Sequence, residues 1–170
     1  MGGFIEFIEN TAIATWVRES PSIFAYTTVL SLHAMGLAIV VGVGAAVSLR
    51  VMGFFRGIPL APLLRLFPVM WIGFTINAVS GILLLMASAS NMLSNVMFLI
   101  KLGLIALAVI NMELLRNRLS AEVPAGDVGV EAVPSSQVRI LALTSIVLWI
   151  GVIISGRLTA YPNFVSALFS

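Results

Sequence analysis

The chain has 170 residues, of which 60% are hydrophobic and 9% are charged, and its mean hydropathy is +1.12. Soluble domains carry about a quarter charged residues, so this chain cannot cover a water-facing surface and needs lipid as its main solvent. The net charge of +2 has no basic run behind it, which argues against a nucleic-acid partner. The absence of cysteine excludes disulfides, thiolate metal sites and iron–sulfur clusters. The length suits a single membrane domain covering residues 1–170.

The N-terminal segment, residues 3–19, is too charged to span a membrane and lacks the basic region and cleavage site of a signal peptide. Its apolar residues recur at helical spacing and its polar residues fall towards the opposite face. We therefore predict an amphipathic helix on the membrane surface, with Trp16 at headgroup level; the alternative is a frayed tail. The apolar set is Ile5, Ile8, Ala12 and Trp16, and the polar set is Glu6, Glu9 and Asn10.

Four apolar windows follow, and each reaches the roughly 20 residues that a helix needs to cross a hydrocarbon core. Backbone groups in lipid must be satisfied within the segment, so the windows predict helices rather than strands. Pro21 and Pro68 mark the first two starts, because proline suits the first helical position. The predicted fold is an all-α membrane protein, a four-transmembrane-helix bundle preceded by the interfacial helix. The windows are residues 21–53, 68–89, 96–115 and 138–161.

Arginine and lysine predict the orientation of the bundle. Residues 54–67 and 117–137 connect the windows in pairs, and most of the basic residues lie in or beside them. The positive-inside rule places both connections in the cytoplasm and both termini on the periplasmic side of a bacterial inner membrane. The connection 117–137 is rich in proline, glycine and serine, which favours a flexible linker. The basic residues beside the connections are Arg50, Arg56, Arg65, Arg116, Arg118 and Arg139, and those on the other side are Arg18, Lys101 and Arg157.

With this orientation, all four helices contribute polar groups to the outer half of the bundle. Charges inside the bilayer cost at least about 2.5–3.5 kcal/mol, so such groups normally face the interior and are often functional. Each has a simpler alternative: the cations can anchor the protein at the interface, and the others can form interhelical hydrogen bonds or interface aromatic contacts. Trp149 is also expected to be an interface or lipid-facing aromatic. The predicted ligand-binding set is His33, Gly36, Asn77, Ser80, Lys101, Arg157 and Tyr161.

His33 is the only histidine, and an imidazole at its depth cannot reach the interface. It either hydrogen-bonds a neighbouring helix or binds a haem, a quinone carbonyl or a metal. Gly36 lies one turn further along the same face, where a glycine lets a flat ligand or a partner helix approach closely.

Methionines suggest a further site. Met86, Met92 and Met97 fall around the outer turn between the second and third windows, and Met35 is near His33. Thioethers and imidazole suit Cu(I), and a methionine can be the second axial ligand of a haem. The alternative is ordinary gap filling by methionine.

Several motifs, taken in order, resemble an uncharacterised family of small bacterial integral-membrane proteins, classed as a domain of unknown function. The motifs are WVRES (16–20), LHAMG (32–36), LRVMG (49–53), WIGF (71–74), SGILL (80–84), Lys101, Asn111 and GRLTAY (156–161). The resemblance implies a four-helix bacterial membrane protein and carries no activity with it. The layout is also loosely similar to cytochrome b561 and the copper-resistance D group, at the level of fold alone. Those cytochromes usually pair histidines on facing helices, so a single histidine excludes bis-histidine haem ligation within one chain.

The sequence has no inward acid pair, nucleophile–base set or phosphate loop, so it argues against hydrolysis, group transfer and an enzyme acting by itself. The leading hypothesis is a redox-associated membrane subunit that holds a quinone or a single haem b near His33. One alternative is a non-catalytic accessory or scaffold subunit of a larger membrane complex. Another is a small transporter or copper-handling protein. A homo-oligomer would bring a second His33 to the site.

Overall fold

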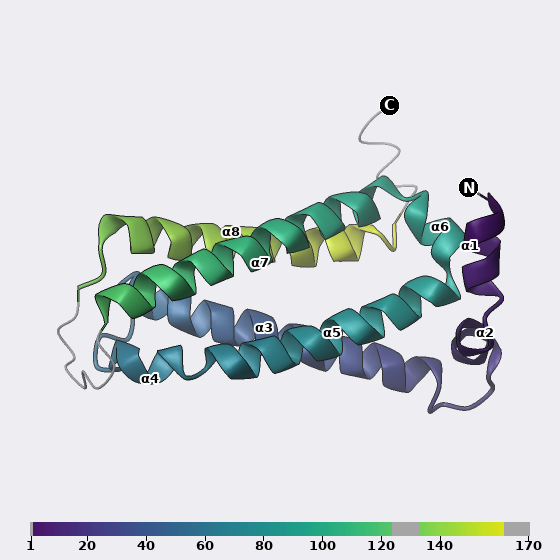
Figure 1. The fold of residues 1–170 in the computed structure, drawn as a ribbon, viewed down its shortest axis with the longest axis horizontal. Helices are drawn as coiled ribbons and strands as arrows, with labels where there is room; N and C mark the ends of the chain where they lie inside the picture. Colours follow the sequence, from purple (N-terminus) through teal and green to yellow (C-terminus); the bar gives the residue numbers. More distant parts are fainter. Residues whose placement is uncertain (1, 124–132, 162–170) are drawn as a thin grey trace.

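The structure is a computed structural model, which describes residues 2–123 and 133–161 and contains helices and connections in those ranges (Figure 1). Four segments are long and apolar enough to cross a membrane: α3, α4 through α5, α7 and α8. This confirms the all-α fold with four long apolar helices. The elements are α1 (Gly2–Glu9), α2 (Ala12–Glu19), α3 (Tyr26–Val51), α4 (Leu60–Leu64), α5 (Phe67–Ala87), α6 (Ala89–Leu93), α7 (Val96–Glu122) and α8 (Ser136–Leu158).

The long helices form two close pairs, α3 with α5 and α7 with α8, and α3 also packs against α8 to join the pairs. Helices α5 and α7 are not a close pair, and Figure 1 shows them diverging towards α6. Asn111 Nδ2 donates to the Leu141 carbonyl oxygen at 3.0 Å and ties α7 to α8. We call the two ends of the bundle the α4 end and the α6 end; the predicted outer half is the α6 end.

Small residues set the spacing of the first pair. A Cβ added to Gly36 would lie 2.6 Å from the Asn77 backbone nitrogen and 2.7 Å from the Gly73 carbonyl oxygen. A Cβ added to Gly73 would lie 2.6 Å from Ile39 Cγ2. Apolar side chains gain little by leaving lipid for a helix interface, so close backbone approach at glycine is an important source of packing energy here.

The N-terminal segment forms two helices where one was predicted. The chain turns at Thr11, whose Oγ1 accepts a hydrogen bond from the Ala14 N–H at 3.4 Å and so caps α2. The buried residues of α2 are Ala14 and Val17, and α2 packs on α5. Trp16 is 51% exposed, which leaves it available to the membrane interface.

The α1 helix is held against α6 by one carboxylate. Glu9 Oε1 accepts hydrogen bonds from both the backbone N–H and the hydroxyl of Ser90, each at 2.7 Å. The bond from the Ser90 N–H has the larger effect and the bond from its hydroxyl the next, and together they hold the pKa of Glu9 below its usual value. Figure 1 shows α1 and α6 side by side at one end of the bundle.

The first long helix begins at Tyr26 and ends at Val51, inside the predicted window of 21–53. Its beginning is delayed by a turn in which Ser22 Oγ accepts from the Phe24 N–H at 3.2 Å. Its end is followed by Gly53, whose φ of 99° suits glycine. Arg50 is 4% exposed and donates to the Ile58 and Arg56 carbonyl oxygens, so it stabilises this connection from within.

The predicted linker of residues 117–137 is partly helical. Helix α7 continues to Glu122, because Leu119 is fully buried and the Val123 N–H still bonds to the Leu119 carbonyl oxygen. Residues 124–132 of that linker lie outside the described residues. At this end of α7, Arg116 Nη2 lies 3.1 Å from Glu113 Oε1 and forms an ion pair with it.

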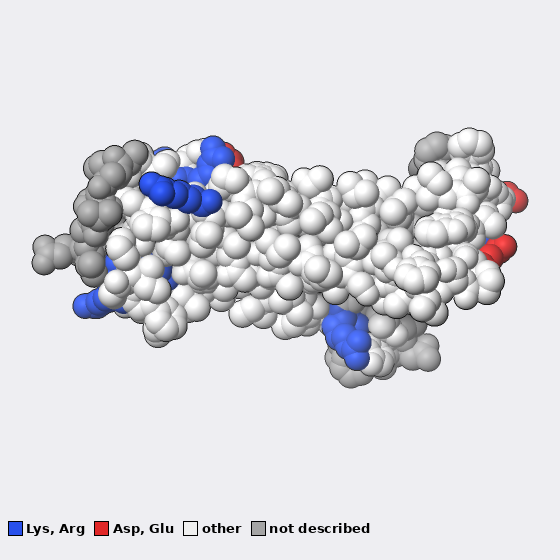
Figure 2. Space-filling view, turned by 90° about the horizontal axis from the view of Figure 1, so that it is seen from below, with Lys and Arg blue, Asp and Glu red and all other residues white. Residues whose placement is uncertain are grey.

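The remaining boundaries shift slightly. Helix α5 begins one residue earlier than predicted and ends at Ala87, and α4 lies within the predicted connection 54–67. Helix α8 runs from Ser136 to Leu158 in place of 138–161, with Ser135 Oγ accepting from the Val138 N–H. The described parts of both connections between paired windows lie at the α4 end, where arginine atoms gather in Figure 2.

Candidate functional site

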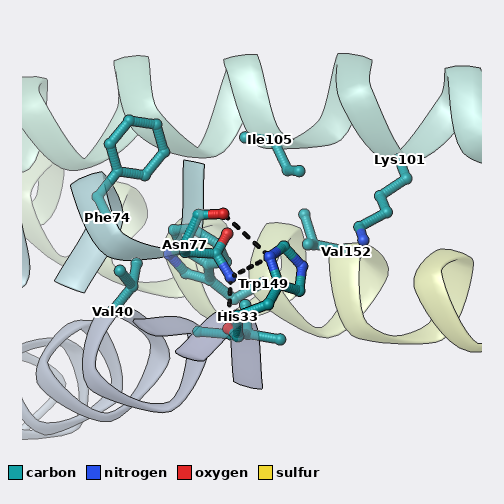
Figure 3. A pocket seen from close by; sticks show the side chains of 9 residues that line it. His33, Val40, Phe74, Asn77, Lys101, Ile105, Trp149 and Val152 are labelled. Atoms are coloured by element: carbon teal, nitrogen blue, oxygen red, sulfur yellow. Dashed lines mark hydrogen bonds between the residues drawn. The ribbon is translucent and has the colours of Figure 1, made fainter. Parts of the chain in front are cut away.

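His33 lies on α3 and bonds to α5 (Figure 3). Its Nδ1 is 2.9 Å from the Asn77 carbonyl oxygen and 3.3 Å from Ser80 Oγ, and Asn77 Nδ2 donates back to the His33 carbonyl oxygen at 2.7 Å. A carbonyl oxygen only accepts, so Nδ1 carries the proton in this bond. When the ring is neutral, its lone pair therefore lies on Nε2, which has no hydrogen-bond partner among the described residues.

Two glycines decide how the imidazole fits. A Cβ added to Gly81 would lie 3.0 Å from His33 Cε1, so this glycine leaves room for the ring on α5. Gly36, one turn beyond His33, contacts the α5 backbone. Of the two uses predicted for Gly36, the structure shows the close approach of a partner helix.

A cavity lies between the two helix pairs, and all four long helices line it (Figure 3). Its free volume is about 10 Å³, which is room for about one water molecule. Drug-sized ligands occupy pockets of about 300–1,000 Å³, so a ring would need the pairs to separate. The lining residues are His33, Leu37, Val40, Phe74, Asn77, Lys101, Ile105, Trp149 and Val152.

Lys101 extends from α7 across the cavity towards α8. A Cβ added to Gly156 would lie 3.5 Å from Lys101 Nζ and 3.4 Å from its Cε, so Gly156 leaves space for the side chain. Lys101 has no hydrogen-bond or ion-pair partner in the described part of the chain. An imidazole from one helix pair and an ammonium from the other thus face one cavity without a counter-charge from the described residues.

The remaining polar candidates divide into two groups. Ser80 belongs to the site: it is 4% exposed, its Oγ donates to the Ile76 carbonyl oxygen at 2.6 Å, and it lies beside His33 Nδ1. Arg157 and Tyr161 do not line the cavity. They contact each other on the exposed surface, with Arg157 Nη2 at 3.2 Å from the Tyr161 hydroxyl and its guanidinium carbon 5.4 Å from the ring centroid.

The methionine prediction has no support in the cavity. Met35 is 60% exposed, and neither Met86, Met92 nor Met97 lines either cavity of the bundle. Among the described residues there is also no group of three or more histidine, cysteine or acidic side chains that would hold a metal. A copper site built from His33 and these sulfur atoms therefore lacks an observed ligand set.

Trp149 is the residue that the sequence interpretation placed wrongly. It is 5% exposed and lines the cavity, and its indole Nε1 is buried with no hydrogen-bond partner in the described ranges of the chain. A Cβ added to Gly44 would lie 3.6 Å from this nitrogen. The signal was available in the sequence, because Ser145 and Trp149 are four residues apart and a serine there indicates a face that packs on a helix.

A second cavity continues from the first towards the α4 end, and Val40, Phe74 and Trp149 line both. It also has a free volume of about 10 Å³. No charged side chain lines it. The residues that belong to the second cavity alone are Met70, Trp71, Val109 and Met112.

Comparison with protein-family models, curated proteins and solved structures finds no match in any of the three. The resemblance to the uncharacterised bacterial membrane family, and the likeness to cytochrome b561, therefore stay predictions from the sequence. Any function must be argued from the cavity itself.

Proposed function

We propose that this protein is a redox-associated membrane subunit that binds a quinone head group between the α3–α5 and α7–α8 pairs. The observation that carries the proposal is the pairing of His33 and Lys101 across one cavity, each from a different helix pair. The ammonium of Lys101 can donate to a quinone carbonyl oxygen, and Nε2 of the neutral His33 ring can accept from a quinol hydroxyl. One site then suits both redox forms of the ligand.

The hydrogen bonds of His33 support this assignment. Nδ1 is committed to the Asn77 carbonyl oxygen, which fixes both the ring orientation and the tautomer. The Asn77 amide bond to the His33 carbonyl oxygen, at 2.7 Å, fixes α3 against α5 at the same level. A group that only filled space in lipid would need neither bond, since apolar side chains pack there without desolvation cost.

A single haem is the second candidate, and one observation favours it. Metal-ligating histidines usually donate their other ring N–H to a carbonyl or carboxylate, as His33 does. His33 would then be one axial ligand, with the second supplied by another copy of the chain or another subunit. Lys101, which lines the same cavity, would be available to pair with a haem propionate.

The absorption spectrum and the organic extract of the gently solubilised protein test the proposal. We expect no Soret band and about one quinone per chain. Lys101→Met should lower the amount of retained quinone at least tenfold. Arg157 is a cation on the exposed surface of the neighbouring helix, so Arg157→Met should leave the amount of retained quinone unchanged. A Soret band that His33→Ala abolishes would replace the quinone by haem. Absence of both ligands, with no rebinding of added quinone, would refute the proposal.

We also propose that the α4 end faces the cytoplasm of a bacterial inner membrane, which the gathering of arginine at that end supports. The chain has no cysteine, so single cysteines report the orientation without background. In sealed inverted vesicles, Gly57→Cys should react with an impermeant maleimide and Ile23→Cys should not. The opposite pattern would reverse the orientation.

A further inference from the structure

We infer that the ligand is an amphiphile whose apolar tail enters from lipid between α5 and α7 and lies in the second cavity. This inference rests on the proposed function, because it extends the same site. The tail would be the prenyl chain of a membrane quinone, with the ring near His33 and Lys101 and the chain running towards the α4 end.

The shape of the two cavities is the first argument. They share Val40, Phe74 and Trp149 in their linings, so a polar cavity and an apolar cavity are neighbours between the helix pairs. Lys101 lines the first and Met112 the second from the same helix, and 11 residues of α helix span about 16 Å. That length exceeds a quinone ring, and only a ligand with a chain would occupy both cavities.

The packing of the helices is the second argument. The pairs α3–α5, α7–α8 and α3–α8 all pack closely, whereas α5 and α7 do not. Separating α5 from α7 therefore breaks the fewest contacts and opens the cavities to lipid. Both cavities are lined from α5 by Phe74 and from α7 by a branched apolar residue, Ile105 in the first and Val109 in the second. Apolar side chains on both edges suit the passage of a hydrocarbon chain and exclude a charged solute.

The third argument is the polarity of the two cavities. The charged or titratable side chains that line the two cavities, His33 and Lys101, are both in the first. In the second, the side-chain nitrogens of the lining residues are those of the two indoles, Trp71 and Trp149. A tail gains packing contacts there without stripping water from a charge.

Photoaffinity labelling in nanodiscs tests where the tail lies. One probe is menaquinone with a diazirine in its prenyl tail, and a matched probe carries the diazirine on the ring. We expect the tail probe to label Met112 and Val109, the ring probe to label Ile105 near Lys101, and excess unlabelled menaquinone to suppress both. Leu107, on the same helix and 55% exposed, is the internal control for a tail that remains in bulk lipid.

A substitution sharpens the result. Val109→Trp fills the second cavity and should reduce tail labelling of Met112 at least fivefold while ring labelling persists, which also shows that the variant is folded. Leu107→Trp should change neither. If the tail probe labels Leu107 and ignores Met112 while the ring probe still labels Ile105, the tail inference is wrong and the quinone site stands. If neither probe gives labelling that menaquinone suppresses, the proposed function itself fails.

Discussion

Substituting Gly36 by alanine tests whether the contact of α3 with α5 holds the site together. The added Cβ would lie 2.6 Å from the Asn77 backbone nitrogen and 2.7 Å from the Gly73 carbonyl oxygen, against 3.4–4 Å for ordinary contact. Both atoms are backbone, so the helices must separate by most of an ångström. Overpacking of this kind costs about 1–3 kcal/mol. Separation would also lengthen the bonds between Asn77 and His33.

The matched control is Gly42→Ala, because nothing lies within 4 Å of a Cβ at Gly42 on the same helix. Alanine is favoured over glycine by about 1 kcal/mol in a helix, so the control should be neutral or stabilised. The propensity gain is common to both variants and cancels, so we expect Gly36→Ala to be less stable than Gly42→Ala by the overpacking cost, about 1–3 kcal/mol in reversible unfolding in mixed micelles. In a chain of this size that difference corresponds to a melting temperature lower by about 2–12 °C. Equal stability of the two variants would refute the contact and the account of the site built on it.

Two further predictions concern polar groups outside the His33 hydrogen bonds. Ser48 Oγ is fully buried and has no hydrogen-bond partner among the described residues, so Ser48→Ala should raise the free energy of unfolding by about 1 kcal/mol. Ser145→Ala loses a bond to Met112 Sδ and should lower the free energy of unfolding. Stabilisation of both variants alike would contradict the assignment of Ser48. The pKa of Glu9 is lower in the folded state than its usual value of 4.5. Its bonds to Ser90 therefore contribute fully to stability when the pH is above 4.5, and this contribution is lost as the pH falls from 4.5 through the folded-state pKa. Amide exchange in α1 should therefore rise, beyond its intrinsic pH dependence, on acidification of the wild type and not of Glu9→Gln.

The fold was largely predictable because its main cause is composition. A chain with 9% charged residues must put its long apolar windows in lipid, and the four windows all correspond to helices. The boundaries were less predictable. Pro21 suits a helix start, yet Ser22 accepts a local hydrogen bond and the helix begins at Tyr26. Helix α7 extends past the predicted end because Leu119 is buried against other parts of the fold. The periodicity of the sequence does not show that such a tertiary contact exists.

The site was predictable in part, for a related reason. Polarity singled out His33, Asn77, Ser80 and Lys101. The structure brings His33, Asn77 and Lys101 to one cavity between the helix pairs and places Ser80 beside His33. Polarity did not decide by itself which way each helix turns, and for α8 the spacing of Ser145 and Trp149 was the one sequence signal for the inward face. Trp149 faces the interior because Gly44 leaves space for it there, a contact between helices far apart in sequence.

Two of the cations towards the α6 end, Lys101 and Arg157, show what distinguishes a site residue from an anchor. Arg157 lies on the surface of α8 and contacts the Tyr161 ring, an arrangement that needs no ligand and suits the membrane interface. Lys101 lies on the adjacent helix and could also anchor the protein at the interface by extending outwards. A charge held within the bilayer costs at least about 2.5–3.5 kcal/mol, and extending outwards would avoid much of this cost. Lys101 lines the cavity with His33 instead, beside a glycine that gives it room. Because an anchor gains nothing from that position, the placement of Lys101 favours a bound hydrogen-bond acceptor, and Lys101→Met compared with Arg157→Met separates the two roles.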